Sequence, residues 1–196
     1  MIETRTYPRR IASEAGAFEL RPMVASDEAD VLAFAQRLPV HDLLFLPRDI
    51  SQPKVLAAWI KEIDRGVLTS LLAVRGHDVL GCAALVRDPL SWSAHTGEIR
   101  VIVSREARGQ GVGRALSQEV FALALSLGLE RLTAQMTVDQ VGAITIFEGL
   151  GFRGEALLRK HVRDRDGALH DIVVLGHDVA QAQGALQAYG VADAVS

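Results

Sequence analysis

A run of alternating glycines in the middle of the chain is the feature best suited to chemistry. Glycine occupies every second position from Gly109 to Gly113, after an apolar segment at Val101 to Val103 and before a long amphipathic stretch. This order predicts a strand, a tight turn and the start of a helix. The first N–H groups of a helix lack partners and carry partial positive charge, and glycines let an anion approach them. The segment therefore predicts a phosphate-binding loop, to which Arg108 and Arg114 would add charge.

Three established loop patterns can be compared with this segment. A dinucleotide-binding fingerprint requires G-x-G-x-x-G, and its last glycine is missing whether the count starts at Gly109 or at Gly111. A Walker loop requires Gly-Lys-Ser/Thr after its glycines, and that sequence is missing too. The remaining pattern is Arg/Gln-x-x-Gly-x-Gly/Ala, which Arg108, Gly111 and Gly113 fill. A glycine-rich turn that binds no ligand stays open as an alternative.

The elements that must position this loop follow from hydrophobic periodicity. Strands are predicted at 18–21, 68–74, 79–86, 98–103, 131–136, 152–162 and 169–177. Helices are predicted at 26–38, 51–65, 111–127 and 140–150. Long runs of strands combined with alternating helices indicate a mixed α/β sheet with helices on both faces. We expect a solvated N-terminal arm at 1–17, one domain at 18–178 and a helical tail at 179–196.

A second motif reinforces the glycine-rich loop. Gln140, Ala143 and Phe147 precede Gly151-Phe152, with spacing close to Asn-x-x-Ala, three residues, Tyr, then Gly-Phe. Together the two motifs resemble the signatures of the GNAT superfamily of N-acetyltransferases. The resemblance covers residues 18–178 and implies a twisted, mostly antiparallel sheet of about six to seven strands with helices on both faces.

The resemblance implies acetyl-CoA as co-substrate, with direct attack of a primary amine on its thioester and no metal. Backbone N–H groups of the loop would hold the pyrophosphate, which points to Gln110, Gly111, Val112, Gly113 and Arg114. The backbone of the preceding strand would bind the pantetheine and the acyl carbonyl, which points to Ile102 and Val103 and also to Val101. Arg108, Gly109, Gln140 and Phe147 complete the expected cofactor-binding set.

Few residues of the sequence are candidates for the general base or the general acid of this reaction. The amine must lose a proton before it attacks. Glu98, at the start of the strand that enters the loop, is the candidate base, with a plain solvent-facing carboxylate as the alternative reading. His95 is the other candidate base, since an imidazole changes charge near neutral pH. Phe147 stands where many relatives place a tyrosine, and a phenyl ring has no proton to give to the departing thiolate.

The acceptor side is expected between residues 40–50 and residues 160–171. The residues there that could attract a cationic amine or pack against its stem are His41, Asp42, Phe45 and Asp49. Simple core or interface packing of the 40–50 segment is the competing interpretation. Candidate acceptors are a protein lysine, a protein N-terminus, an amino acid or a small polyamine, with a protein lysine placed first.

Composition narrows the class of protein. The 196 residues are 49% hydrophobic and 23% charged with a formal net charge of -3, and no basic stripe for nucleic acid is visible. We expect no membrane segment, because no apolar run approaches the ~18 residues that a spanning helix needs. Cys82 is the single cysteine, so an internal disulfide is excluded. A cytoplasmic enzyme is expected, with a homodimer as one candidate assembly and a catalytically silent acyl-CoA sensor as the alternative function.

Overall fold

One continuous sheet organises the molecule. The computed structural model describes residues 6–179 and contains a sheet with strand order β1-β2-β3-β4-β5-β6-β8-β7. Its strands are β1 (Arg9–Ile11), β2 (Phe18–Pro22), β3 (Leu68–Arg75), β4 (Asp78–Val86), β5 (Thr96–Val103), β6 (Arg131–Thr137), β7 (Arg153–Arg163) and β8 (Leu169–Asp178). Neighbouring strands are antiparallel except for β5 and β6, which are parallel. The predicted mixed, mostly antiparallel sheet is therefore confirmed.

The sheet has eight strands, one more than the upper limit of the prediction. The additional strand is β1, which lies inside the segment expected to be a solvated arm and pairs with β2 from Arg9 opposite Leu20 to Ile11 opposite Phe18. The Arg9 guanidinium forms an ion pair with the buried carboxylate of Glu119. This partner lies 110 residues away along the chain, so the basic character of the arm alone could not reveal it.

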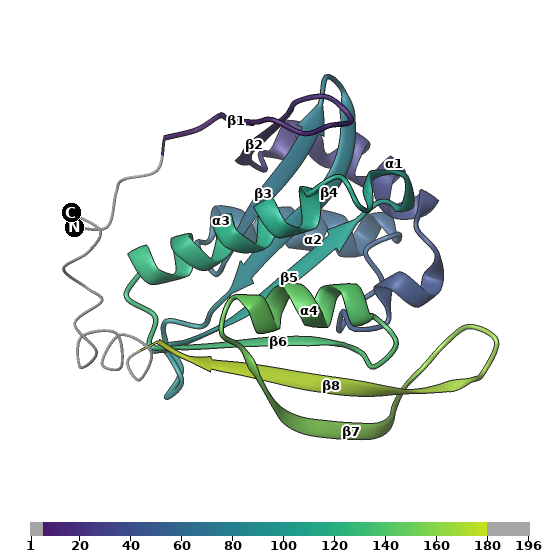
Figure 1. Cartoon of the computed structure of the whole chain (residues 1–196), viewed down its shortest axis with the longest axis vertical. Helices are drawn as coiled ribbons and strands as arrows, with labels where there is room; N and C mark the ends of the chain where they lie inside the picture. Colours follow the sequence, from purple (N-terminus) through teal and green to yellow (C-terminus); the bar gives the residue numbers. More distant parts are fainter. Residues whose placement is uncertain (1–5, 180–196) are drawn as a thin grey trace.

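Two pairs of helices cover the two faces of the sheet. The helices α1 (Glu28–Arg37) and α2 (Pro53–Asp64) lie on one face, and α3 (Val112–Ser126) and α4 (Val141–Gly149) lie on the other (Figure 1). Short 3-10 turns occur at Ala25–Asp27 (η1), Val40–Leu43 (η2) and Arg105–Ala107 (η3). Both faces of the central strands are thus buried, which explains the nearly continuous apolar runs of β3 and β4.

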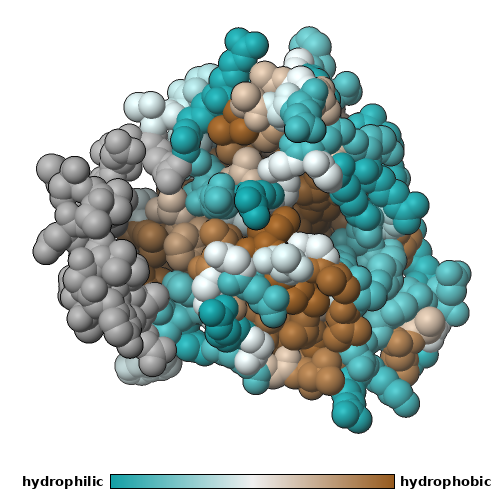
Figure 2. All heavy atoms as spheres, viewed as in Figure 1, coloured by the Kyte–Doolittle hydropathy of each residue, from teal (hydrophilic) through white to brown (hydrophobic). Residues whose placement is uncertain are grey.

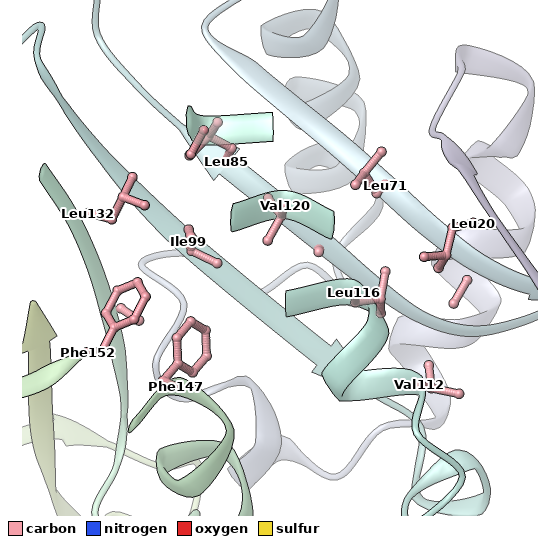
Figure 3. Packing of buried hydrophobic residues seen from close by; sticks show 14 of the residues in the cluster. Leu20, Leu71, Leu85, Ile99, Val112, Leu116, Val120, Leu132, Phe147 and Phe152 are labelled. Carbon is pink, nitrogen blue, oxygen red and sulfur yellow. The ribbon is translucent and has the colours of Figure 1, made fainter. Parts of the chain in front are cut away.

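Each helical layer has its own hydrophobic cluster. Beneath α3, Leu116 and Val120 are fully buried and pack toward Ile99 and Leu71 of the sheet (Figure 3). On the opposite face, Trp59 is buried and donates a hydrogen bond from Nε1 to Ser70 Oγ at 2.8 Å. The central strands of the sheet are therefore packed on both faces, including β5, which leads into the glycine-rich loop.

An opening forms where β5 and β6 separate. The two strands pair only from Thr96 opposite Arg131 to Ile99 opposite Ala134. Beyond that point β5 stays with β4 as far as Val103, while β6 stays with β8 as far as Thr137. The carboxyl ends of the two parallel strands consequently diverge, and α3 and α4 begin beside this divergence (Figure 1).

The β7–β8 hairpin closes the sheet on the side of β6. Its register shifts between Leu158 and Val162, where the chain passes through Lys160 at φ 52 and the amide of Lys160 donates to Asp171 Oδ1 at 2.7 Å. The tail predicted to be helical at 179–196 lies outside the described residues apart from Val179. Among the helices of residues 6–179, none is long and apolar enough to cross a membrane.

Candidate active site

The glycine-rich loop turns β5 into α3 through left-handed backbone. Gly109 has φ 75 and Gly111 has φ 81, a region that favours glycine. Gly111 is the N-cap residue of α3, and no side chain of residues 6–179 caps the helix. The first hydrogen bond of the helix runs from Ala115 N to Gly111 O at 3.0 Å, so the preceding amides at the helix start are available to a ligand.

The loop also leaves space for an anion. A β-carbon built on Gly109 or on Gly111 would meet no atom of the described residues within 4 Å. Unoccupied space in front of free amides at a helix N-terminus suits a phosphate group. The residues present therefore fit the pyrophosphate of coenzyme A, and the predicted phosphate loop has the backbone geometry that such a ligand requires.

The free edge of β5 faces the opening. Ser104 N donates to Leu80 O at 2.9 Å, and the carbonyl oxygen of Ile102 lies 2.7 Å from the position of a β-carbon on Gly81. These contacts direct the peptide groups of Ile102 and Ser104 toward β4. Because peptide groups alternate in direction along a strand, those of Val101 and Val103 point toward the opening. Of the three predicted residues, Val101 and Val103 are thus the ones whose backbone can bind an extended ligand arm.

A cavity of about 850 Å³ occupies the opening. Its lining comes from η2 and the segment after it, β5, η3, the glycine-rich loop, α3, and α4 with the two residues before it. These residues are His41, Asp42, Phe45, Val101, Ile102, Val103, Arg105, Ala107, Arg108, Gly109, Gly111, Gly113, Arg114, Ser117, Asp139, Gln140, Val141, Gly142, Ala143, Ile146 and Phe147. In the space-filling view, hydrophobic surface gathers over α4, which borders this cavity (Figure 2). A second hollow, of about 470 Å³, lies between β1 and α3 and contains none of the predicted site residues.

All of the predicted cofactor residues line the cavity except Gln110 and Val112. Gln110 turns its side chain away, accepting a hydrogen bond from Arg75 and donating one to the carbonyl of Glu106. Val112 is fully buried in the core beneath α3, so only its backbone amide faces the helix start. On the acceptor side, His41, Asp42 and Phe45 line the cavity and Asp49 does not.

Both candidate bases lie outside the cavity lining. Glu98 sits in the paired part of β5 and accepts two hydrogen bonds, both at 2.8 Å, from Nε and Nη2 of Arg100. His95 is exposed before β5, and its carbonyl accepts from the amides of Glu130 and Arg131. Glu98 is therefore fixed by a cation of its own strand, and His95 lies at the end of β5 opposite the loop.

Phe147 is part of the core and also part of the cavity wall. It is 3% exposed, and its ring meets that of Phe152 in an edge-to-face contact with centroids 5.1 Å apart. Gln140, the N-cap residue of α4, accepts hydrogen bonds from the amides of Ala143 and Ile144 through its backbone carbonyl. The second sequence motif thus forms the wall of the cavity opposite the glycine-rich loop.

The carboxylates near the cavity mouth already have partners. Asp42 accepts from Arg108 Nη2 at 2.6 Å, and Asp49 accepts from Arg165 Nη2 at 2.6 Å. Burial disfavours the charge on Asp49, but hydrogen bonds from Ser51 and Arg165 outweigh it and lower the pKa of this carboxyl. The charges of Asp42 and Asp49 are therefore balanced by cations of the same chain.

Sequence reasoning missed three polar residues of the cavity, which are Arg105, Ser117 and Asp139. Ser117 is 1% exposed and follows Gly113 by one helical turn, so the i, i+4 spacing on α3 could have revealed it. Asp139 lies between β6 and α4 and holds His41, with Nε2 and Oδ2 2.7 Å apart. These two residues are 98 positions apart, and no local pattern connects them. Among residues 6–179, no group of three or more His, Cys, Asp or Glu side chains is placed to hold a metal ion.

Comparison with known proteins agrees with this geometry. Residues 24–152 match the model of the acetyltransferase (GNAT) family. N-acetyltransferase 8F1 of Rattus norvegicus is 33% identical over 84 residues, which cover 42% of this chain and 38% of that protein. The chain thus matches well under half the length of this curated relative.

Solved structures share the fold at low sequence identity. An acetyltransferase of the GNAT family from Streptococcus pneumoniae superposes with a TM-score of 0.71 at 18% identity, covering 82% of this chain and 99% of that one. A phosphinothricin acetyltransferase from Sinorhizobium meliloti, solved in complex with AcCoA, gives a TM-score of 0.69 at 20% identity, with 82% and 88% covered.

Proposed function

Because the chain belongs to the acetyltransferase (GNAT) family, we propose that it transfers an acetyl group from acetyl-CoA to a primary amine. One observation carries the proposal. A single cavity joins the uncapped start of α3 to the free edge of β5 at Val101 and Val103. A ligand with a phosphate at one end and an extended amide arm at the other matches both parts of this cavity.

Each part of the cavity has a separate task. The amides at the start of α3 would hold the pyrophosphate, and the helix dipole favours that charge. The outward peptide groups of Val101 and Val103 would bind the pantetheine amides and direct the thioester toward the cavity mouth. Acetyl-CoA supplies an activated acyl group, so the remaining task of the protein is to hold the amine in line and remove its proton.

The acceptor would enter between η2 and the loop that precedes α4. Val141 lines the cavity and is 64% exposed, which offers apolar surface to the stem of an aliphatic amine. His41 and Asp139 lie at the same entrance. A lysine of a protein or peptide is the acceptor class we place first, because its long apolar stem ends in a single amine.

Two relatives support the choice of acetyl-CoA as co-substrate and of nitrogen as the acceptor atom. The Sinorhizobium meliloti protein was solved with AcCoA bound, and the rat relative is named as an N-acetyltransferase. These properties belong to those proteins. They favour acetyl-CoA over other acyl donors as the first compound to test here.

The test is release of the coenzyme A thiol from acetyl-CoA in the presence of an amine panel that contains a lysine peptide, free amino acids and polyamines. We expect amine-dependent release, with the mass of the acceptor increased by one acetyl group. Binding of acetyl-CoA is measured separately by calorimetry. Absence of both binding and turnover would refute the proposal.

A catalytically silent acyl-CoA sensor is the second candidate, and Phe147 is the observation that favours it. Phe147 provides no proton at the position where relatives commonly carry a tyrosine. Tight acetyl-CoA binding together with no turnover on any amine of the panel would establish this alternative in place of the enzyme.

A further inference from the structure

Two histidines from distant segments meet at the mouth of the cavity. The rings of His41 in η2 and His170 in β8 have centroids 5.0 Å apart and planes at 70°. Each ring also has its own aspartate. His41 Nε2 lies 2.7 Å from Asp139 Oδ2, and His170 Nε2 lies 2.7 Å from Asp164 Oδ2. The arrangement is therefore a pair of His–Asp couples that face each other.

The aspartates determine which ring nitrogen carries the proton. Burial opposes the charge on Asp139, but the pKa of this carboxyl is lowered, and the hydrogen bond with His41 contributes to that lowering. The hydrogen bond from His170 is the main cause of the lowered pKa of Asp164. An ionised carboxylate can only accept, so Nε2 of each neutral ring is the donor. Nδ1 of His41 is left with a lone pair that can accept a proton.

The position of His41 distinguishes it from the other candidate bases. Like Val101 and Val103, His41 lines the cavity, whereas Glu98 and His95 lie outside the lining. The side chain of His41 is 36% exposed, so a proton taken up inside the cavity can leave to solvent. An ammonium such as that of lysine has a pKa near 10.4 and must be deprotonated before it can attack.

We propose that His41, oriented by Asp139, is the proton acceptor for the amine substrate, and that His170, held by Asp164, positions the His41 ring. This inference rests on the proposed acetyl transfer. The ammonium nitrogen gives its first proton to Nδ1 of His41. The neutral nitrogen then attacks the thioester carbon, so that a C–N bond forms and the C–S bond breaks. The second proton from nitrogen ends on the departing sulfur, and the proton on His41 passes to solvent.

The groups around His41 support a base that returns to its neutral form. Asp139 stabilises a positive charge on the ring, while a proton on His170 at 5.0 Å opposes it. The adjacent Asp42 is already balanced by Arg108. Asp139, Asp164 and His170 act here as positioning residues.

The test compares His41→Gln with His77→Gln, whose imidazole is exposed in the turn between β3 and β4. Acetyl-CoA affinity is measured by calorimetry, and kcat and KM for the amine are measured from pH 5.5 to pH 9. We expect His41→Gln to bind acetyl-CoA within about 3-fold of wild type but to lose roughly 10²–10⁴-fold in kcat, the usual contribution of a general base. Its residual rate should rise steadily with pH as free amine accumulates, and added imidazole should restore part of the lost rate. His77→Gln should behave like wild type.

Three results would overturn the assignment. Wild-type kcat and pH profile in His41→Gln, together with their loss in Glu98→Gln, would give the proton to Glu98 instead. A raised KM for the amine at unchanged kcat would make His41 a binding residue only. If the wild-type protein binds acetyl-CoA but acetylates no amine, both the proposed function and this inference fail. If the wild type is active and His41→Gln is unaffected, only this inference fails.

Discussion

Arg108 and Asp42 join the glycine-rich loop to η2 across the mouth of the cavity, with Nη2 and Oδ2 2.6 Å apart. Arg108 is half exposed, while Asp42 is 9% exposed. The same guanidinium lines the cavity beside the glycine-rich loop, where it can also bind a pyrophosphate. A bound anion and Asp42 would therefore compete for Arg108. Binding of the cofactor at the loop would in this way weaken the contact between the loop and η2, which forms one wall of the acceptor entrance.

Replacement of Asp42 by asparagine tests this competition. Asp42→Asn removes a negative charge from the loop and releases Arg108, so we expect acetyl-CoA to bind up to about 5-fold more tightly, since a half-exposed ion pair is worth at most about 1 kcal/mol. Calorimetry at two salt concentrations measures the change, and Asp64→Asn, at the exposed end of α2, is the control. Weaker binding would instead mean that Asp42 holds Arg108 ready for the pyrophosphate.

Two glycines of the loop should respond in opposite ways to alanine. Gly111 has φ 81, so Gly111→Ala introduces roughly 1–2 kcal/mol of strain and should lower both stability and acetyl-CoA affinity. Gly113 lies inside α3, where a β-carbon would make ordinary 3.5 Å contacts with Ile146 and Val103. Gly113→Ala should therefore gain up to ~1 kcal/mol of stability, with acetyl-CoA affinity within about 2-fold of wild type.

Thermal unfolding and calorimetry on the two variants separate the effects. Alanine is also compatible with the last position of the loop pattern, which supports retention of binding in Gly113→Ala. Unchanged acetyl-CoA affinity in Gly111→Ala would show that the amides at the start of α3 are not the ligand site.

Local patterns were sufficient to predict the loop and the elements on either side of it. Strand, alternating glycines and amphipathic helix are contiguous in sequence, and the uncapped start of α3 at Gly111 follows directly from them. The motif from Gln140 to Phe152 likewise predicted α4 and the wall it forms. Both features depend on interactions between residues close together in the chain.

Features that depend on distant partners were missed. Strand β1 is accompanied by the ion pair between Arg9 and Glu119 of α3. The hydrogen bond between His41 and Asp139 joins η2 to the segment that follows β6. The sequence also ranked Ile102 above Val101 as a backbone ligand. Hydrophobic periodicity shows that successive residues of a strand point in alternate directions. It does not show which peptide groups face β4, because that depends on the strand pairing, here the hydrogen bond from Ser104 N to Leu80 O.

Phe147 should matter more for packing than for proton transfer. Phe147→Ala removes a ring that is 3% exposed and in contact with Phe152, so we expect a loss of 3–5 kcal/mol in the free energy of unfolding. Turnover should fall in parallel with the folded fraction. Phe147→Leu keeps most of the apolar volume and should recover most of both properties. A large loss of kcat in a stable Phe147→Leu protein would show that the ring acts directly on the reacting groups.

The ion pair of Arg21 with Asp27 should stabilise the fold in a pH-dependent way. Asp27 is 6% exposed, accepts from Arg21 at 2.7 and 2.8 Å, and also caps the amide of Val24. The hydrogen bond from Arg21 is the main cause of the lowered pKa of this carboxyl, against an ordinary value of 3.8. A group with a lowered folded-state pKa contributes its full stability above the unfolded value and loses it as pH falls through the folded value.

Asp27→Asn should therefore cost about 2 kcal/mol at pH 7, the usual size for hydrogen bonds to a charged group. The difference from wild type should begin to shrink below about pH 4 and be mostly lost once the pH lies below the folded-state pKa. Urea unfolding at a series of pH values measures this difference, with Asp78→Asn, at the exposed first residue of β4, as the control. A difference that stays constant down to strongly acidic pH would show that Asp27 acts through its shape and neutral hydrogen bonds, because the lost charge would then make no contribution.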